Sequence, residues 1–319
     1  EQNNNLSLKD RNMKKGTLIF AAAAMMLSFC SCSEQDAATG SESAKLITVS
    51  TSIGHMTRMA TDEKGAQTFT EGDEISVYAW TGSADVAPAA EARTVNNAIN
   101  KLTGKVWVAT PQMLWKNQKE KHYFIGIYPN RKVEDLAADT HTLQTDNQEA
   151  SDLLIAVNAK GLSYENDASE PVQLNFSHVM AKIVVNLTFK NQWGGIPEVK
   201  TVAVKDAARE ATVNYLTKTI TPKAADETMP PAAKADLELP ATTANTCYQS
   251  VLIPQNDIQK LAIIIGDKTF SYNHGTPFKF ESGKITTINL EVGRDKVILD
   301  EVKISDWETG STFSGEALD

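Results

Sequence analysis

The sequence VMAKIVVNLTF, residues 179–189, is the clearest β-strand pattern of the chain. It is rich in β-branched residues and contains neither proline nor glycine, which is the composition that favours an extended, pleated backbone. We therefore expect a strand here, and we expect the rest of the fold to be organised around strands of the same kind.

Shorter runs of the same character lie on both sides of this stretch, and glycine, proline or polar turn residues separate them. They occupy residues 45–53, 69–80, 105–109, 122–128, 153–157, 172–176, 201–204, 211–215, 248–253, 261–265, 269–272, 284–292 and 297–304. Helical periodicity is scarce, and residues 221–246, rich in proline, alanine, threonine and acidic residues, are expected to form a long loop. Short strands separated by turns predict an all-β protein made of sandwiches, without an internal repeat.

The stretch from Met13 to Asp36, MKKGTLIFAAAAMMLSFCSCSEQD, is typical of an export signal. Two lysines are followed by an apolar segment, residues 18–29, which is too short to span a bilayer. Ser31 lies directly before Cys32, and this junction looks like the lipobox of bacterial lipoproteins, in which the cysteine is acylated. Cys30 is the weaker candidate because bulky Phe29 precedes it. An ordinary secretory signal with incidental cysteines is the alternative.

The predicted signal divides the N-terminal part of the chain. Residues 1–31 are expected to be upstream residues and signal peptide, and residues 32–44, small, polar and acidic, a flexible tether. Acyl chains on Cys32 would anchor the protein to a membrane. Acidic residues directly after such a cysteine resemble the signal that sends Bacteroidetes lipoproteins to the cell surface.

Net charge and cysteine content exclude several classes of function. The chain has a formal net charge of −9, and residues 1–31 carry more basic than acidic side chains, so the remainder is more acidic still. An acidic chain does not provide the basic surface that nucleic acid requires, and we expect no nucleic-acid partner. If Cys30 leaves with the signal and Cys32 is acylated, Cys247 has no partner for a disulfide. Its apolar surroundings predict a buried strand thiol.

No motif of catalysis or metal binding stands out. The sequence lacks a C-x-x-C, a P-loop, a G-x-S-x-G and a G-x-G-x-x-G, and the acidic run 139–152 lacks the spacing of an EF-hand. A carboxylate pair of the glycosidase kind leaves no local signature, because its members are distant along the chain. We expect no enzyme activity, no metal and no cofactor. We also expect a structural role for His178, at the start of a strand, and core positions for the five tryptophans.

Several of these segments, taken in order, resemble the fimbrillin-like family, the type V pilins of the Bacteroidetes. The most specific is PVQLNFSHVMAKIVVNL at residues 171–187, with an F-x-H-x-x-A-K core. The others are the lipobox at Cys32, F-x-x-G-D-x-I-x-V at 69–77, Tyr128-Pro129, Asp152-Leu153-Leu154, LIPQ at 252–255, F-x-x-G-K at 280–284 and I-x-x-W at 304–307.

The resemblance implies two transthyretin-like β-sandwich domains in tandem. The F-x-H-x-x-A-K strand would open the second one, which places the N-terminal sandwich at residues 45–167 and the C-terminal sandwich at 168–319. It also implies a location on the outer membrane and cell surface, in fimbriae that serve adhesion, with other fimbrial subunits as partners.

The resemblance further implies assembly by strand exchange. A protease cuts after an arginine in the loop that follows the first strand, and a strand from another subunit fills the groove left behind. In this chain the removable strand would be residues 45–53, the cleavage site Arg58-Met59, and the donor strand residues 297–304. From the residues alone, Arg58 is an ordinary loop arginine.

A second hypothesis remains open, in which the chain is a surface lipoprotein that keeps its first strand and never polymerises. It would then bind a glycan or a host protein; ligands on host or bacterial surfaces are expected under either hypothesis. The sequence does not distinguish shaft, anchor and tip subunits.

Overall fold

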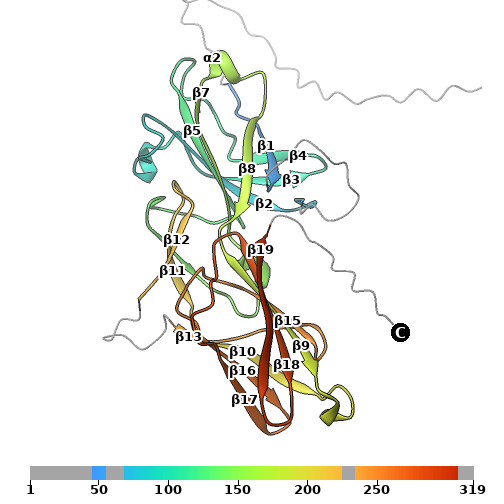
Figure 1. Cartoon of the computed structure of the whole chain (residues 1–319). Helices are drawn as coiled ribbons and strands as arrows, with labels where there is room; N and C mark the ends of the chain where they lie inside the picture. The colour runs from blue at the N-terminus through green and yellow to red at the C-terminus, as the bar shows by residue number, and fades with distance from the viewer. Residues whose placement is uncertain (1–44, 55–67, 225–233, 308–319) are drawn as a thin grey trace, which may run out of the picture. The chain divides into compact units, whose positions relative to one another are not determined.

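The computed structural model describes residues 45–54, 68–224 and 234–307, and Figure 1 shows that strands dominate this part of the chain. The expected all-β fold is confirmed. The helices are one turn long: α1 (Gln148–Ser151), α2 (Tyr164–Asp167) and the 3-10 turns η1 (Ala90–Ala92) and η2 (Asn191–Trp193). No helix of the described residues is both long and apolar enough to span a bilayer.

The largest sheet has seven strands in the order β1-β8-β7-β5-β2-β3-β4. The bounds of its strands are Val49–Ile53 (β1), Glu74–Thr81 (β2), Val95–Thr103 (β3), Val106–Thr110 (β4), His122–Tyr128 (β5), Leu154–Leu162 (β7) and Val172–His178 (β8). Its central strands are buried on both faces. On β2, for example, Ile75 and Val77 point into one apolar cluster, whereas Tyr78 and Trp80 point into another. Burial on both faces explains why β2 and β5 are nearly continuous apolar runs.

A three-stranded sheet, β12-β11-β6, contributes to the second of these clusters, with Ala211 and Val213 of β11 among its members. Its strands are β6 (Asp139–Thr142), β11 (Glu210–Asn214) and β12 (Thr219–Pro222). Because β11 pairs with β6 over Thr142 to Asp139, a segment from the second half of the chain completes the core of the first half.

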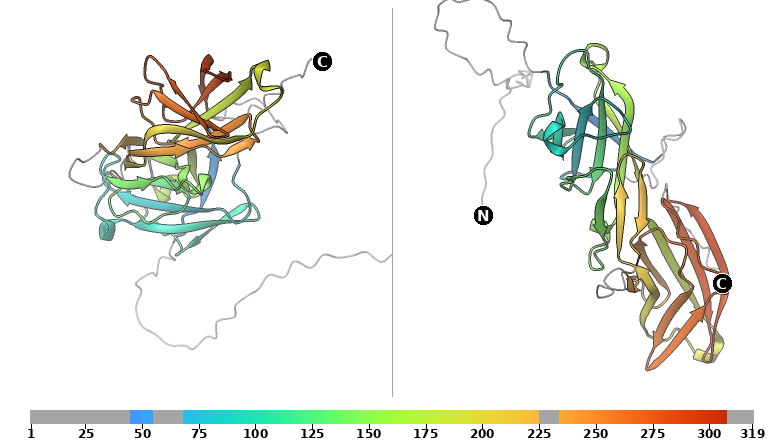
Figure 2. Two further views of the ribbon diagram at one scale, coloured as in Figure 1. Left: turned by 90° about the horizontal axis from the view of Figure 1, so that it is seen from below. Right: turned by 90° about the vertical axis from the view of Figure 1, so that its left-hand side faces the viewer.

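The remaining strands form a sandwich whose two layers are visible in Figure 2. One layer is β13-β10-β16-β17, with β10 (Val199–Ala208), β13 (Lys234–Glu238), β16 (Lys260–Ile265) and β17 (Lys268–Asn273). The other is β14-β15-β9-β18-β19, with β9 (Ala181–Phe189), β14 (Ala241–Thr243), β15 (Cys247–Leu252), β18 (Lys284–Val292) and β19 (Val297–Asp306). Alternate residues of β9, from Ala181 to Leu187, point into the shared core.

The strand pairings place the boundary between the two sandwiches later in the chain than the sequence predicts. The boundary expected near residue 168 precedes β8, but β8 pairs with β1 and β7 in the seven-stranded sheet. The change of sheet comes between β8 and β9, so the F-x-H-x-x-A-K segment contributes to both sandwiches. The expected loop 221–246 is corrected too, because it contains β13 and β14.

Candidate functional site

The first described strand, β1, is an edge strand that joins its sheet through one short ladder. Residues 49–53 of β1 pair in parallel with residues 172–176 of β8, from Val49–Val172 to Ile53–Phe176. Just before β1 the chain pairs instead with residues 113–115: the Ile47 N–H donates to the Met113 carbonyl over 2.8 Å. In the sheet order β1 is an edge strand, so its only ladder is the one with β8.

The inward side chains of this segment complete an apolar core. Ile47 is 3 % exposed and Val49 is 6 % exposed, and both belong to the cluster that contains Ile75, Trp107 and Phe176. Phe176 in turn lies so close to β5 that a Cβ at Gly126 would come within 2.6 Å of its ring. This close approach explains why glycine occupies position 126. The apolar residues on which β1 packs are therefore tightly packed themselves.

Polar contacts fix the register of β1. On the outer face, Ser50 Oγ donates to Gln173 Oε1 and Ser52 Oγ donates to Asn175 Oδ1, each over 2.7 Å. On the inner face, Trp107 Nε1 donates to Thr51 Oγ1 over 3.0 Å. A shift by one residue would break all three contacts and turn the apolar side chains outward.

The other edge of β1 borders a hollow instead of a strand. Its volume is about 670 Å³, and its walls include Thr48 to Ile53, Phe69, Leu102, Val106 and Trp107. Val106 and Val108 of β4 are 64 % and 52 % exposed. The strand β4 therefore exposes apolar side chains beside the groove that β1 occupies.

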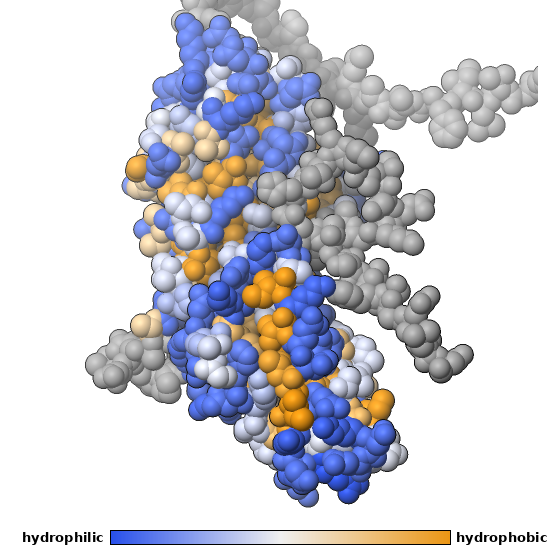
Figure 3. Space-filling view, in the orientation of Figure 1, coloured by the Kyte–Doolittle hydropathy of each residue, from blue (hydrophilic) through white to orange (hydrophobic). Residues whose placement is uncertain are grey.

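The last described strand, β19, is an edge strand of the second sandwich. It pairs antiparallel with β18 along its whole length, from Lys284–Asp306 to Val292–Val297. Its apolar side chains are only half covered, and Ile304 is 41 % exposed. Figure 3 shows an apolar stripe along this strand.

Trp307 closes the end of β19 against residues of both sandwiches. Its ring stacks on His178 at the end of β8, with ring centroids 4.2 Å apart, and the backbone N–H of Trp307 donates to the Gly283 carbonyl over 2.9 Å. His178 Nδ1 lies 2.9 Å from Asp152 Oδ1. Lys182 Nζ lies 5.7 Å from the Trp307 ring centroid, and burial lowers the pKa of Lys182. We call Asp152, His178, Lys182 and Trp307 the clamp of β19.

A protein-family model described as fimbrillin-like matches residues 57–307. The chain belongs to the fimbrillin-like family. No curated protein matches the sequence at a significant level.

Solved structures share the fold of this fimbrillin-like chain at low sequence identity. A proposed cell adhesion protein from Bacteroides ovatus is 20 % identical, with a TM-score of 0.62 over 83 % of this chain and 98 % of the other. One from Bacteroides uniformis is 16 % identical, with a TM-score of 0.60 over 78 % and 100 %. A fimbrial protein from Bacteroides vulgatus is 15 % identical, with a TM-score of 0.51 over 82 % and 99 %.

The structure places none of the three predicted site residues, but it does describe the two strands predicted to take part in exchange. Cys32, Arg58 and Met59 lie outside the described residues, so their predicted roles remain predictions. The predicted removable strand coincides with the segment that β1 ends, and the predicted donor strand coincides with β19. His178 lies at the end of β8 and not at the start of a strand, which corrects that detail. Cys247 begins β15 and is half-buried rather than buried.

Some residues that hold β1 in place had no sequence signal. Gln173 and Asn175 are exposed polar residues of a strand, and only the parallel pairing with β1 reveals what they bind. Trp107 was expected in a core, which is where it lies, but its indole hydrogen bond to β1 was not foreseen. Among the described side chains, no group of three histidine, cysteine, aspartate or glutamate residues could hold a metal ion.

Proposed function

We propose that this chain is a structural subunit of cell-surface fimbriae and serves adhesion. In this proposal it is exported as a lipoprotein through Cys32 and assembled by strand exchange after cleavage between Arg58 and Met59. Its partners are other fimbrial subunits, and it has no catalytic role. The observation that carries the proposal is the seating of β1, an edge strand whose side chains complete a core and whose chain then continues into the segment with Arg58.

Cleavage at Arg58 would leave β1 held by non-covalent contacts alone. Its departure would uncover the packing surface of Ile47 and Val49, which stabilises the fold by roughly 3–6 kcal/mol. It would also leave the backbone groups of residues 172–176 that face β1 without a ladder. An apolar groove beside an unpaired strand edge is stabilised best by another strand, which replaces both the apolar contacts and the hydrogen bonds.

The strand β19 has the properties of a donor. It has one neighbour in its sheet, and its half-covered apolar face gains more burial in a complete groove than it has in its own sandwich. Its apolar and polar residues alternate around Val302, Lys303 and Ile304, as they do in the segment that β1 ends.

The test is controlled cleavage of the purified chain by an arginine-specific protease, followed by size-exclusion chromatography and electron microscopy. We expect cleaved chains to form linear polymers and Arg58→Gln chains to remain monomeric. Lys64→Gln, in the same segment, is the matched control and is expected to polymerise normally. Complete cleavage at Arg58 that yields only stable monomers would contradict strand exchange and favour the non-polymerising surface binder.

A further inference from the structure

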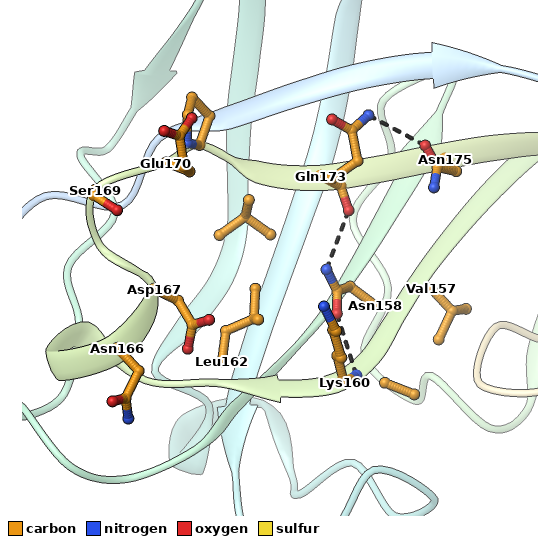
Figure 4. A pocket seen from close by; sticks show the side chains of 13 residues that line it. Val157, Asn158, Lys160, Leu162, Asn166, Asp167, Ser169, Glu170, Gln173 and Asn175 are labelled. Atoms are coloured by element: carbon orange, nitrogen blue, oxygen red, sulfur yellow. Dashed lines mark hydrogen bonds between the residues drawn. The ribbon is translucent and has the colours of Figure 1, made fainter. Parts of the chain in front are cut away.

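The ladder between β7 and β8 is unusually short for two consecutive antiparallel strands. It comprises three residue pairs, from Leu154–His178 to Ala156–Phe176, although both strands continue well beyond the last pair. Past that point the strands separate and border a hollow of about 560 Å³, shown in Figure 4. We call this hollow the β7–β8 slot.

Local contacts account for the separation. β8 pairs with β1 over five residues on its other edge, which holds it away from β7. On β7, Asn158 Oδ1 accepts a hydrogen bond from the Lys160 N–H, and the pairing with β5 shifts register just beyond Asn158. Such local side-chain bonds and register shifts bend a strand away from its neighbour.

The slot is bordered by main-chain groups without a ladder partner on the other strand. The Val172 N–H donates to the Thr48 carbonyl on the β1 side, so by the alternation of a strand Gln173 and Asn175 direct their N–H and C=O groups toward β7. The next hydrogen-bonded pair after Ile155–Ser177 would be Val157–Asn175, and that pair is not formed. The two strands bordering the slot are thus not paired with each other beyond Ala156–Phe176.

One side chain already makes a hydrogen bond of the kind that a strand in the slot would make. Asn158 Nδ2 reaches across and donates to the Gln173 carbonyl over 3.2 Å, as the dashed line in Figure 4 shows. This is the hydrogen bond that a peptide N–H lying between the two strands would make. The side-chain amides of Asn166, Gln173 and Asn175 also line the slot, but they bind neighbouring side chains of the chain itself, so the main chain is the part of the slot that a peptide would pair with.

We propose that the β7–β8 slot is a binding site for one extended peptide segment of another protein, which lies as a strand between β7 and β8 and pairs with both. Main-chain pairing on two sides supplies the affinity, and the partly exposed apolar side chains Val157 and Leu162 favour an alternating apolar and polar peptide. No aromatic ring belongs to the described residues that line the slot, which disfavours a sugar. The proposal concerns the chain with β1 in place, because the pairing of β1 with the opposite edge of β8 helps to keep the slot open.

The probe is the pentapeptide Thr-Val-Thr-Val-Thr with acetylated and amidated ends, titrated into the isotope-labelled full chain and followed by NMR. We expect saturable shifts of the amides of residues 157–160 and 173–175. The same peptide with its valine nitrogens methylated lacks N–H donors and is expected to bind at least tenfold more weakly. Absence of saturable shifts, or equal binding of the methylated peptide, would overturn the proposal.

Two variants locate the peptide in the slot. Asn158→Asp keeps the acceptor for the Lys160 N–H but cannot donate to the Gln173 carbonyl, so the pentapeptide should bind about fivefold more tightly, the equivalent of one net hydrogen bond. Asn191→Asp, at an exposed asparagine in η2, is the matched control and should leave the affinity unchanged. Weaker or unchanged binding by Asn158→Asp would contradict displacement of the side chain at position 158 by the peptide.

A cross-link provides the second measurement. In a chain whose native cysteines are serines, Val157→Cys and Asn175→Cys would join β7 to β8 at the position of the missing pair. The oxidised form should lose the pentapeptide and regain it on reduction. Equal binding by the oxidised and reduced forms would show that the peptide binds elsewhere and would overturn the proposal.

Discussion

At the scale of single residues, His141 illustrates how a polar side chain is held inside this fold. It is 3 % exposed, and Arg131 Nη1 donates to its Nδ1 over 3.0 Å. Because Nδ1 accepts, Nε2 carries the proton and donates to the Ser151 carbonyl over 3.2 Å. Arg131 also pairs with Asp139 over 2.9 Å. This arrangement fits the neutral imidazole, because an imidazolium would carry a proton on Nδ1 and could not accept a hydrogen bond from Arg131.

The position of His141 predicts acid sensitivity. Burial, helped by the charge of Arg131, lowers the pKa of His141 from 6.5 to about 4. The unfolded chain therefore binds more protons between pH 4 and 6.5, so the free energy of unfolding should rise with pH across that window, by about 3 kcal/mol from this residue. Urea unfolding at a series of pH values measures the slope. His141→Gln should flatten it, and an unchanged slope in that variant would contradict the assignment.

At the scale of elements, the clamp decides how firmly β19 stays in its own sheet. Trp307 is 7 % exposed, and its stacking on His178 ties the end of β19 to the end of β8. Loss of a buried tryptophan ring costs about 3–5 kcal/mol. If β19 is the donor strand, the clamp opposes its release.

Trp307→Ala should therefore free β19 selectively. We expect faster hydrogen exchange of the β19 amides and, after cleavage at Arg58, faster polymerisation. Trp193→Ala is the control, because Trp193 packs on Phe189 and Phe270 in the same sandwich and lies outside the clamp. If both variants accelerate polymerisation equally, general destabilisation and not the clamp would be the cause.

The elements that the sequence predicted are those whose side chains alone favour a strand. The pattern at residues 284–292 coincides with β18, and the opening stretch contains β9. The strands that were missed, β3, β6, β12, β13 and β14, contain polar runs such as DTHT in β6 and asparagines in β3. Asn100 of β3 is fully buried, so pairing with β2 and β4, and not residue preference, makes this segment a strand.

At the scale of the whole molecule, the arrangement of the strands depends on pairings between distant segments. Ser50 of β1 binds Gln173, 123 residues away, and β11 returns to pair with β6 of the first half. No local pattern encodes such a pairing, so the sequence predicted the segment at 45–53 but neither its parallel partner nor the position of the domain change. The β7–β8 slot likewise depends on where the β7–β8 ladder ends and on the pairing of β8 with β1.

The central claim is that the first strand leaves the subunit when the fibre forms. The most direct test is the intact mass and N-terminal residue of this chain in fibres taken from the cell surface. The account predicts a chain that starts at Met59 and carries no lipid. A fibre-borne chain that starts at acylated Cys32 would show that β1 stays in its groove, and it would contradict strand exchange at this site.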